Sequence, residues 1–260
     1  MVTGLPTVLA IYRYPRFLDI TGPRLQTGPV PDSVAASSAA ADFLSAPTDG
    51  LVWRSDVDPV ALPESSEFTP SQRAILHACV EHFADSGYSG TSVRDVASSV
   101  GIKSASLYKS FASKQAMLDA LSNLGHTEFS RRQVAALLEA GDDPRDQLAA
   151  GVSALVEVTC AYPRLTRIVN REVRNLSPAG FKRDQVARLQ SADILHQVLE
   201  RGQARGLFDV PDPTAVTILI WGLGVALASW FPYAPTVTVE ELAKSYSEIV
   251  MRVVGATGGG

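Results

Sequence analysis

Apolar residues recur at helical spacing along nearly the whole chain from Thr69 onward, and no segment alternates apolar and polar residues with a period of two. A recurrence of three to four residues places apolar side chains on one face of an α-helix, whereas a half-buried strand needs strict alternation. We therefore expect an all-α protein. Breaks at glycine, proline and polar clusters divide it into nine helices, of which the last five cover 144–160, 163–175, 178–205, 212–231 and 238–254.

The helical pattern begins abruptly at Thr69. In the sequence TPSQ, Thr69 can cap a helix, the proline suits its first position, and Gln72 is placed to complete a capping box. The residues before it contain eight prolines and no lasting period. We therefore expect residues 1–68 to form a mostly disordered extension, with a translation start further downstream as the alternative.

Two short helices are predicted to meet at Gly101. The first begins at Ser92, with Asp95 three residues later, and the second begins within about three residues of the glycine. Two short helices joined by a tight glycine turn are typical of a helix-turn-helix. A cap at Ser113 opens the following helix. The pattern predicts a three-helix head over 69–118, followed by a six-helix bundle over 119–260.

Positive charge gathers in this head although the chain carries a net charge of -4. Residues 1–68 hold 4 arginines and 8 acidic residues, which leaves 19 basic and 19 acidic residues for the rest of the chain. Binding to a polyanion must therefore depend on local placement of charge. The stretch GIKSASLYKSFASK, residues 101–114, contains three lysines and no acidic residue.

The second short helix has the composition of a DNA-reading helix. Small side chains at its start let a helix approach base edges in the major groove, which is about 12 Å wide. Leu107 and Phe111 would pack the helix onto its neighbours, and Tyr108 would then point away from the core. The alternatives are a solvated lysine-bearing face and a half-buried packing role for Tyr108. The predicted DNA contacts are Thr91, Ser92, Lys103, Ser104, Ala105, Ser106, Tyr108, Lys109 and Lys114.

The run from Arg73 to Leu118 resembles the N-terminal DNA-binding domain of TetR-family transcriptional regulators. The resemblance implies a homodimer whose two heads bind a palindromic operator on double-stranded DNA, as a repressor released by a small ligand. It implies no cofactor. The residues that carry it are Arg73, Ile75, Leu76, Ala78, Phe83, GY at 87–88, TSV at 91–93, DVA at 95–97, GI at 101–102, SLY at 106–108, Phe111, SK at 113–114 and Leu118.

The chain departs from the family pattern at both ends of the second short helix. Lys103 stands where the family usually has a capping Ser or Thr, which makes Ser104 the alternative cap and would shift the helix start by one residue. Lys109 and Ser110 stand where the family usually has His or aromatic residues. A protein-interaction module with a degenerate DNA-binding head is therefore the alternative function.

Three stretches of the bundle resemble the C-terminal domain of actinobacterial repressors of steroid and fatty-acid catabolism, several of which respond to CoA thioesters. They are YPRLTRIVNREVRNLSP, VLERGQARGLF and WFPYAPTVTVEELAKSYSEIVMRVV. The resemblance implies a small hydrophobic or acyl-CoA-like effector. Arg164, Arg167, Arg171 and Arg174 recur along one helical face and form either a phosphate or carboxylate clamp or a salt-bridged exterior stripe.

Two tryptophans are further effector candidates. Trp221 and Trp230, with Phe231, line either an apolar pocket or the core and dimer interface. The 18 uncharged residues 214–231 are just long enough to span a membrane, but the helix has small faces at Gly222 and Gly224 that suit close packing against protein. The resemblance implies that helices 212–231 and 238–254 form the dimer interface, with no membrane partner.

An enzyme is the main competing class. Among the four histidines only His77 and His82 are close in sequence, and their spacing of five residues places them roughly 140° apart on a helix. The sequence has no nucleophile elbow, phosphate loop or CxxC motif. We therefore expect no catalytic residue and no metal site. Cys79 and Cys160 stand in apolar helical surroundings, which is typical of small core residues in a reducing compartment such as the cytoplasm.

Overall fold

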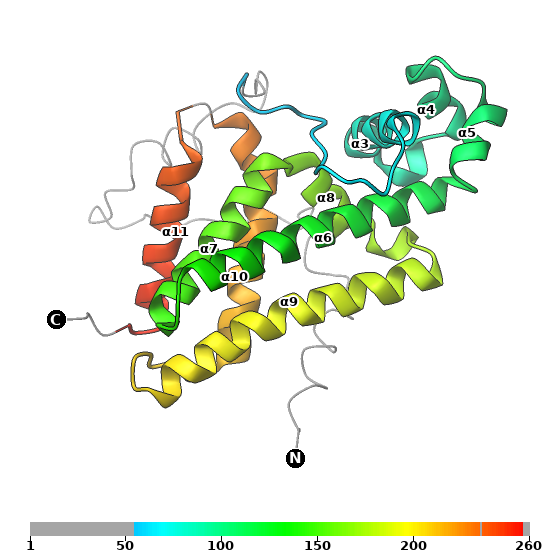
Figure 1. Cartoon of the computed structure of the whole chain (residues 1–260). Helices are drawn as coiled ribbons and strands as arrows, with labels where there is room; N and C mark the ends of the chain where they lie inside the picture. The colour runs from blue at the N-terminus through cyan, green and yellow to red at the C-terminus, as the bar shows by residue number, and fades with distance from the viewer. Residues whose placement is uncertain (1–54, 235, 257–260) are drawn as a thin grey trace, which may run out of the picture. The chain divides into compact units, whose positions relative to one another are not determined.

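The computed structural model describes residues 55–234 and 236–256, so most of the predicted extension, residues 1–54, lies outside the described residues. Across the described ranges the chain forms nine α-helices, two short 3-10 helices and no strand, which confirms the all-α prediction. Figure 1 labels the α-helices α3 (Pro70–Gly90), α4 (Val93–Ser99), α5 (Ser104–Ser110), α6 (Lys114–Glu139), α7 (Pro144–Ala161), α8 (Pro163–Arg171), α9 (Pro178–Ala204), α10 (Pro213–Trp230) and α11 (Val239–Val253).

The helix starts follow from local side-chain caps. Thr69 and Gln72 form the predicted capping box of α3, and Ser92 and Asp95 form that of α4. The Ser113 hydroxyl accepts a hydrogen bond from the Ala116 N–H at the start of α6. Each cap satisfies backbone donors that have no partner inside the helix.

Gly101 makes the turn between α4 and α5. Its φ of 68° lies in the left-handed region, which a side chain disfavours. The Gly101 N–H donates to the Ser98 carbonyl and the Ile102 N–H to the Ala97 carbonyl, both at 3.0 Å. This Schellman motif ends α4, and α5 begins at Ser104, three residues after Gly101. The predicted helix-turn-helix is thereby confirmed.

The head is built on one apolar core that draws on a helix of the bundle. Ile75 and Phe83 of α3 pack there with Leu107 of α5 and with Leu118 of α6. Leu165, Ile168 and Val169 of α8 belong to the same core. The helix α6 begins in this core and continues to Phe129, in a second core, so it connects the head to the bundle.

The segment before α3 is partly ordered, contrary to the prediction for residues up to 68. Leu62 is 7% exposed and lies in the core of the head. The Arg73 guanidinium donates to the Pro63 carbonyl at 2.9 Å, and the His77 Nδ1 lies 2.8 Å from the Val60 carbonyl oxygen. These contacts to side chains of α3 were not visible in the local sequence pattern, which has scattered prolines and no lasting apolar period.

The bundle is organised around α7, which packs against α6, α9, α10 and α11 (Figure 1). Leu148, Val152 and Leu155 of α7 lie in the second core with Leu195 and Leu199 of α9. The predicted helix 163–175 is interrupted, because α8 ends at Arg171 and residues Val173–Asn175 form a 3-10 turn. The Glu172 carboxylate accepts hydrogen bonds from the Tyr88 N–H and the Asn175 amide at this break.

Candidate DNA-binding surface and ligand cavity

The helix α5 buries its apolar face and exposes the predicted reading face. Leu107 is 0% exposed and Phe111 is 7% exposed, so both pack into the head as predicted. Tyr108 is 51% exposed, which favours the outward orientation over the packing alternative. Lys103, Ala105, Ser106 and Lys109 are also exposed, and Ser104 is half-buried. The exposed side chains at the start of the helix are short, which permits close approach to a groove.

The cap of α5 is Lys103 rather than Ser104. Lys103 has extended backbone geometry and makes no side-chain cap, while Ser104 is the first helical residue. The Lys103 carbonyl accepts from the Ser106 N–H at 2.8 Å and the Leu107 N–H at 3.2 Å. The one-residue shift considered from the sequence does not occur, because the Schellman turn at Gly101 sets the helix start.

Thr91 has a structural role in place of the predicted phosphate contact. It is 3% exposed, and its hydroxyl donates to the carbonyls of His82 and Gly87. The hydroxyl therefore holds the last turns of α3 and cannot reach a phosphate outside. Ser92 beside it is exposed, and Arg94 on α4 is exposed as well. Arg94 was missed from the sequence because one arginine on a short helix carries no pattern.

Lys114 lies at the junction of the head helices. Its ammonium donates to the carbonyls of Tyr88 and Thr91 at 2.7 and 2.8 Å, and it lies 4.1 Å from the centre of the Tyr88 ring. Two of its three N–H groups are therefore used inside the protein. Lys114 thus links the start of α6 to the end of α3, and its phosphate contact stays a prediction that only its third N–H could make.

An apolar cavity of about 60 Å³ lies inside the bundle. Its apolar wall includes Phe129 of α6, Leu155 and Val158 of α7, and Trp221 of α10. The rings of Phe129 and Trp221 meet edge to face with centres 4.9 Å apart. The buried indole N–H of Trp221 has no hydrogen-bond partner among the described residues. A buried donor without a partner favours a ligand that supplies an acceptor.

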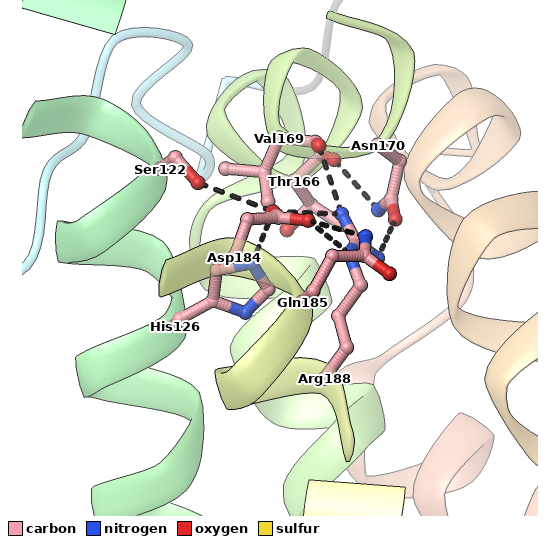
Figure 2. A network of polar contacts seen from close by, with 8 residues as sticks. All are labelled: Ser122, His126, Thr166, Val169, Asn170, Asp184, Gln185 and Arg188. Carbon is pink, nitrogen blue, oxygen red and sulfur yellow. Dashed lines mark hydrogen bonds and ion pairs between the residues drawn. The ribbon is translucent and has the colours of Figure 1, made fainter. Parts of the chain in front are cut away.

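A buried polar network forms one wall of this cavity (Figure 2). The Arg188 guanidinium on α9 donates from Nε to the Asp184 carboxylate at 2.8 Å and from Nη1 to the Asn170 side-chain oxygen at 3.0 Å. The His126 Nε2 on α6 lies 2.7 Å from Asp184 Oδ1, and the Ser122 hydroxyl donates to the same oxygen at 3.2 Å. The network therefore joins α6, α8 and α9 beside the cavity.

Asp184 is ionised in this network. Burial raises the pKa of its carboxyl, but the hydrogen bond from His126 and the charge and hydrogen bond of Arg188 outweigh burial and hold the pKa at about 2. Because an ionised carboxylate only accepts, the His126 Nε2 must carry the proton that it shares with Asp184.

The lowered pKa predicts an acid-sensitive contribution to stability. A carboxyl with a pKa of 3.8 when unperturbed and about 2 in the folded chain stabilises the fold above pH 3.8 and loses that effect as pH falls toward 2. We expect the free energy of unfolding of the natural chain to fall by about 2 kcal/mol more than that of Asp184→Asn between pH 4 and pH 2. Urea unfolding at several pH values measures the difference, and parallel pH profiles for both chains would contradict it.

None of the arginines predicted to contact an effector lines the cavity. Arg167 and Arg171 line a second hollow of about 280 Å³ beside the end of α3. The cavity contacts Leu165, Thr166, Val169 and Asn170 of α8, so the two hollows lie on opposite sides of that helix. Arg164 pairs with Asp85 at 3.1 Å, and Arg174 is exposed on the 3-10 turn. Arg164, Arg167 and Arg171 share one face of α8 as predicted, whereas Arg174 follows the end of the helix. The pair of Arg164 with Asp85 favours the alternative of a salt-bridged exterior stripe.

The two tryptophans predicted as effector contacts lie in different places. Trp221 lines the cavity as predicted for an effector contact, whereas Trp230 packs against a third core formed by Val156, Cys160, Leu227, Phe231, Leu242 and Ala243. The polar residues Arg188, Asp184 and His126 were missed from the sequence. The i, i+4 spacing of Asp184 and Arg188 on one helix was the only local signal.

Comparison with known proteins agrees with this geometry. Residues 75–121 match the family described as bacterial regulatory proteins, tetR family, and residues 141–254 match the tetracyclin repressor-like, C-terminal domain. The HTH-type transcriptional repressor KstR2 of Rhodococcus jostii is 30% identical over 180 residues, which cover 68% of this chain and 87% of that protein. The chain belongs to the TetR family. Its members are transcriptional regulators rather than enzymes.

Solved structures support the same assignment. A bacterial regulatory protein in the tetR family from Rhodococcus RHA1 is similar, with a TM-score of 0.67 and 27% identity, and the alignment covers 74% of this chain and all of that one. The ketosteroid transcriptional regulator KstR2 of Mycobacterium tuberculosis has a TM-score of 0.66 and 26% identity, over 77% of this chain and all of that one. The resemblance seen in the sequence to the actinobacterial repressor group is thereby confirmed.

The helix α10 of this TetR-family chain leaves one apolar face uncovered. It is long and apolar enough to cross a membrane, and 39% of its apolar stretch is buried. One such helix among the described residues is weak evidence for a membrane, because core helices of soluble proteins share these properties. Its exposed residues follow a spacing of four and three: Ala215, Leu219, Gly222, Ala226 and Ser229. On α11, Ile249 and Val253 are 47% and 45% exposed. The predicted packing of this helix against protein is thus met on only part of its surface in the single chain.

Proposed function

We propose that this chain is a ligand-responsive repressor, which binds a palindromic operator as a homodimer in the cytoplasm and is released by a small hydrophobic or acyl-CoA-like effector. The observation that carries the proposal is the exposed face of α5. Its short side chains and two lysines point outward while Leu107 and Phe111 hold the helix to the head. The proposed domains are the head over 69–118 and the ligand-binding and dimerisation region over 119–260, with α6 running through the boundary.

The proposed dimer interface is the exposed face of α10 together with α11. A spacing of four and three residues along α10 makes a straight seam, and its small side chains permit close approach of a second helix. The chain carries no charged residue between Asp212 and Glu240, so a partner helix would bury no unpaired charge there. Dimerisation is also needed for affinity, because one small head contacts few base pairs.

The proposed effector site is the cavity beside Trp221. Ligand pockets are usually about 300 Å³ or larger, so the cavity of about 60 Å³ has to widen to admit an effector. The similarity to a ketosteroid transcriptional regulator supports an apolar effector of the steroid type. The CoA thioester is what the resemblance of the bundle sequence implies. The aromatic and aliphatic wall of the cavity suits the apolar part of such a molecule.

Selection of bound fragments from genomic DNA tests the regulator function. The purified full-length chain should enrich one palindrome, and its affinity for that palindrome should fall steeply as salt concentration rises. Failure to enrich a palindrome would support the protein-interaction alternative and reject the proposed function.

Variants of α5 test the assigned contacts. Lys109→Ala and Ser104→Ala should change which base pairs are preferred, by about 1–3 kcal/mol at the affected position. Tyr108→Phe, which removes only the exposed hydroxyl, should weaken binding to all sequences about equally. Repeating the selection with each variant separates the two effects. If all three variants keep the same preference, α5 is not the reading helix.

A further inference from the structure

A cationic side chain lines the cavity, whereas the carboxylate that pairs with it does not. Arg188 and His126 line the cavity, whereas Asp184 does not. The Asp184 side chain is 0% exposed and accepts hydrogen bonds from Ser122, His126 and Arg188. Its negative charge is thus covered by donors on the side that faces the cavity. Trp221 lines the same cavity, and its buried indole N–H has no hydrogen-bond partner among the described residues.

The hydrogen bonds of Arg188 include bonds to a charged acceptor and bonds to neutral acceptors. Its contacts to Asp184 lie within α9 and join two charges at 2.8 and 3.3 Å. Its contacts across to α8 use neutral acceptors, the Asn170 side-chain oxygen and the Val169 carbonyl, both at 3.0 Å. Breaking the buried pair with Asp184 would leave a charge unpaired inside the protein, whereas replacing a neutral acceptor would not. An incoming carboxylate would therefore replace the α8 partners more readily than Asp184.

We propose that the effector carries a carboxylate at its buried end, which binds Arg188 beside His126 and takes the place of the α8 acceptors Asn170 and Val169. This inference rests on the proposed function and specifies its ligand. The chemical class is a compact apolar chain or ring that ends in a carboxylate. Two sources share that chemistry: a free acid, and the monothioester of a dicarboxylic acid with coenzyme A, whose second carboxylate enters the cavity.

Replacement of Asn170 and Val169 by a ligand carboxylate would change the contacts of α8, the helix that also packs against the head. Arg164 of α8 pairs with Asp85 near the end of α3, and Glu172 just after α8 accepts from the Tyr88 N–H at 3.3 Å. Ile168 and Val169 of α8 lie in the core of the head. Occupation of Arg188 by a ligand removes the two hydrogen bonds that tie this stretch of α8 to α9. The carboxylate would thus bind and alter a link to the DNA-binding head in one step.

Two matched pairs of probes test the inference by calorimetry on the purified full-length chain. The first pair is hexanoate and hexan-1-ol, and the second is adipoyl-CoA and hexanoyl-CoA, which differ only in a terminal carboxylate against a methyl group. We expect the carboxylate member of at least one pair to bind about tenfold or more tightly. Preference in the first pair identifies a free acid, and preference in the second pair alone identifies a thioester of a diacid.

Variants distinguish recognition by Arg188 from a general effect on folding. The double variant Asp184→Asn/Arg188→Met removes both buried charges together, and it should lose the preference for the carboxylate while still binding the neutral probe. Arg183→Met, on the same helix, changes an exposed arginine whose side chain is 57% accessible, and it should keep the preference.

Equal binding of both members of each pair by the natural chain overturns the inference, as does a preference that survives in the double variant. Failure of all four probes to bind also overturns it. The proposed function is judged separately, by whether the unliganded chain selects a palindrome and whether any apolar thioester releases it. The inference can therefore fail while the regulator function stands.

Discussion

Replacing Gly222 with arginine is expected to give a folded monomer whose affinity for the operator is lower by a factor of about 100 or more. A Cβ at Gly222 would meet no atom within 4 Å, so the single chain has room for a longer side chain. The same position lies in the middle of the exposed seam on α10, where a second helix would have to pack against it. Sedimentation measures the association state, and titration of the selected palindrome measures affinity.

Two controls make the Gly222 result specific. Ala204→Arg adds the same charge at an exposed position at the end of α9 and should leave both association and DNA binding unchanged. At Gly224, two residues along α10, an added Cβ would lie 2.8 Å from Leu155 Cδ1, so Gly224→Ala should instead lower stability. A Gly222→Arg chain that stays dimeric would place the interface elsewhere.

The sequence was sufficient wherever structure depends on neighbours along the chain. The caps at Thr69, Ser92 and Ser113 and the turn at Gly101 involve residues a few positions apart, and all were predicted. The burial of Leu107 and the exposure of Tyr108 follow from helical spacing. The exposed face of α5 could therefore be predicted from the sequence alone.

Errors arose where a side chain finds its partner far along the chain. Lys114 looked like an exposed cation at a helix start, but its acceptors are the carbonyls of Tyr88 and Thr91, more than twenty residues earlier. Asp184 and His126 are 58 residues apart, and each looked like an ordinary polar residue of a helix. Long side chains were assigned to the surface because their burial depends on tertiary packing, which helical spacing does not specify.

The cavity beside Trp221 shows the same limit of sequence-based prediction. The aromatic residue Trp221 was predicted to line it, because large apolar side chains on facing helices are common in pockets. Its cation was sought in the arginines near α8, where positive charge is dense in the sequence. In the structure the arginine that lines the cavity is Arg188. A buried cation needs an acid close by, and the partner of Arg188 is Asp184, one helical turn earlier on α9.

Arg188→Met is expected to lower the free energy of unfolding by about 3–5 kcal/mol, because it leaves Asp184 buried without its charged partner. The Arg188 side chain is 9% exposed and that of Asp184 is 0% exposed, so water cannot replace the lost hydrogen bonds. Methionine keeps much of the apolar stem of the arginine, which limits the part of the loss that comes from packing. Urea unfolding followed by circular dichroism measures the change.

The double variant Asp184→Asn/Arg188→Met separates the charge from the packing. It removes the buried anion together with the cation, so it should be more stable than Arg188→Met alone although it carries one more substitution. His126 and Ser122 keep a hydrogen-bond acceptor in the asparagine side-chain oxygen. Arg183→Met, on the exposed side of α9, should change stability by less than about 1 kcal/mol. Additive losses in the double variant would mean that the two charges act independently, and the network beside the cavity would then not be a coupled unit on which a ligand could act.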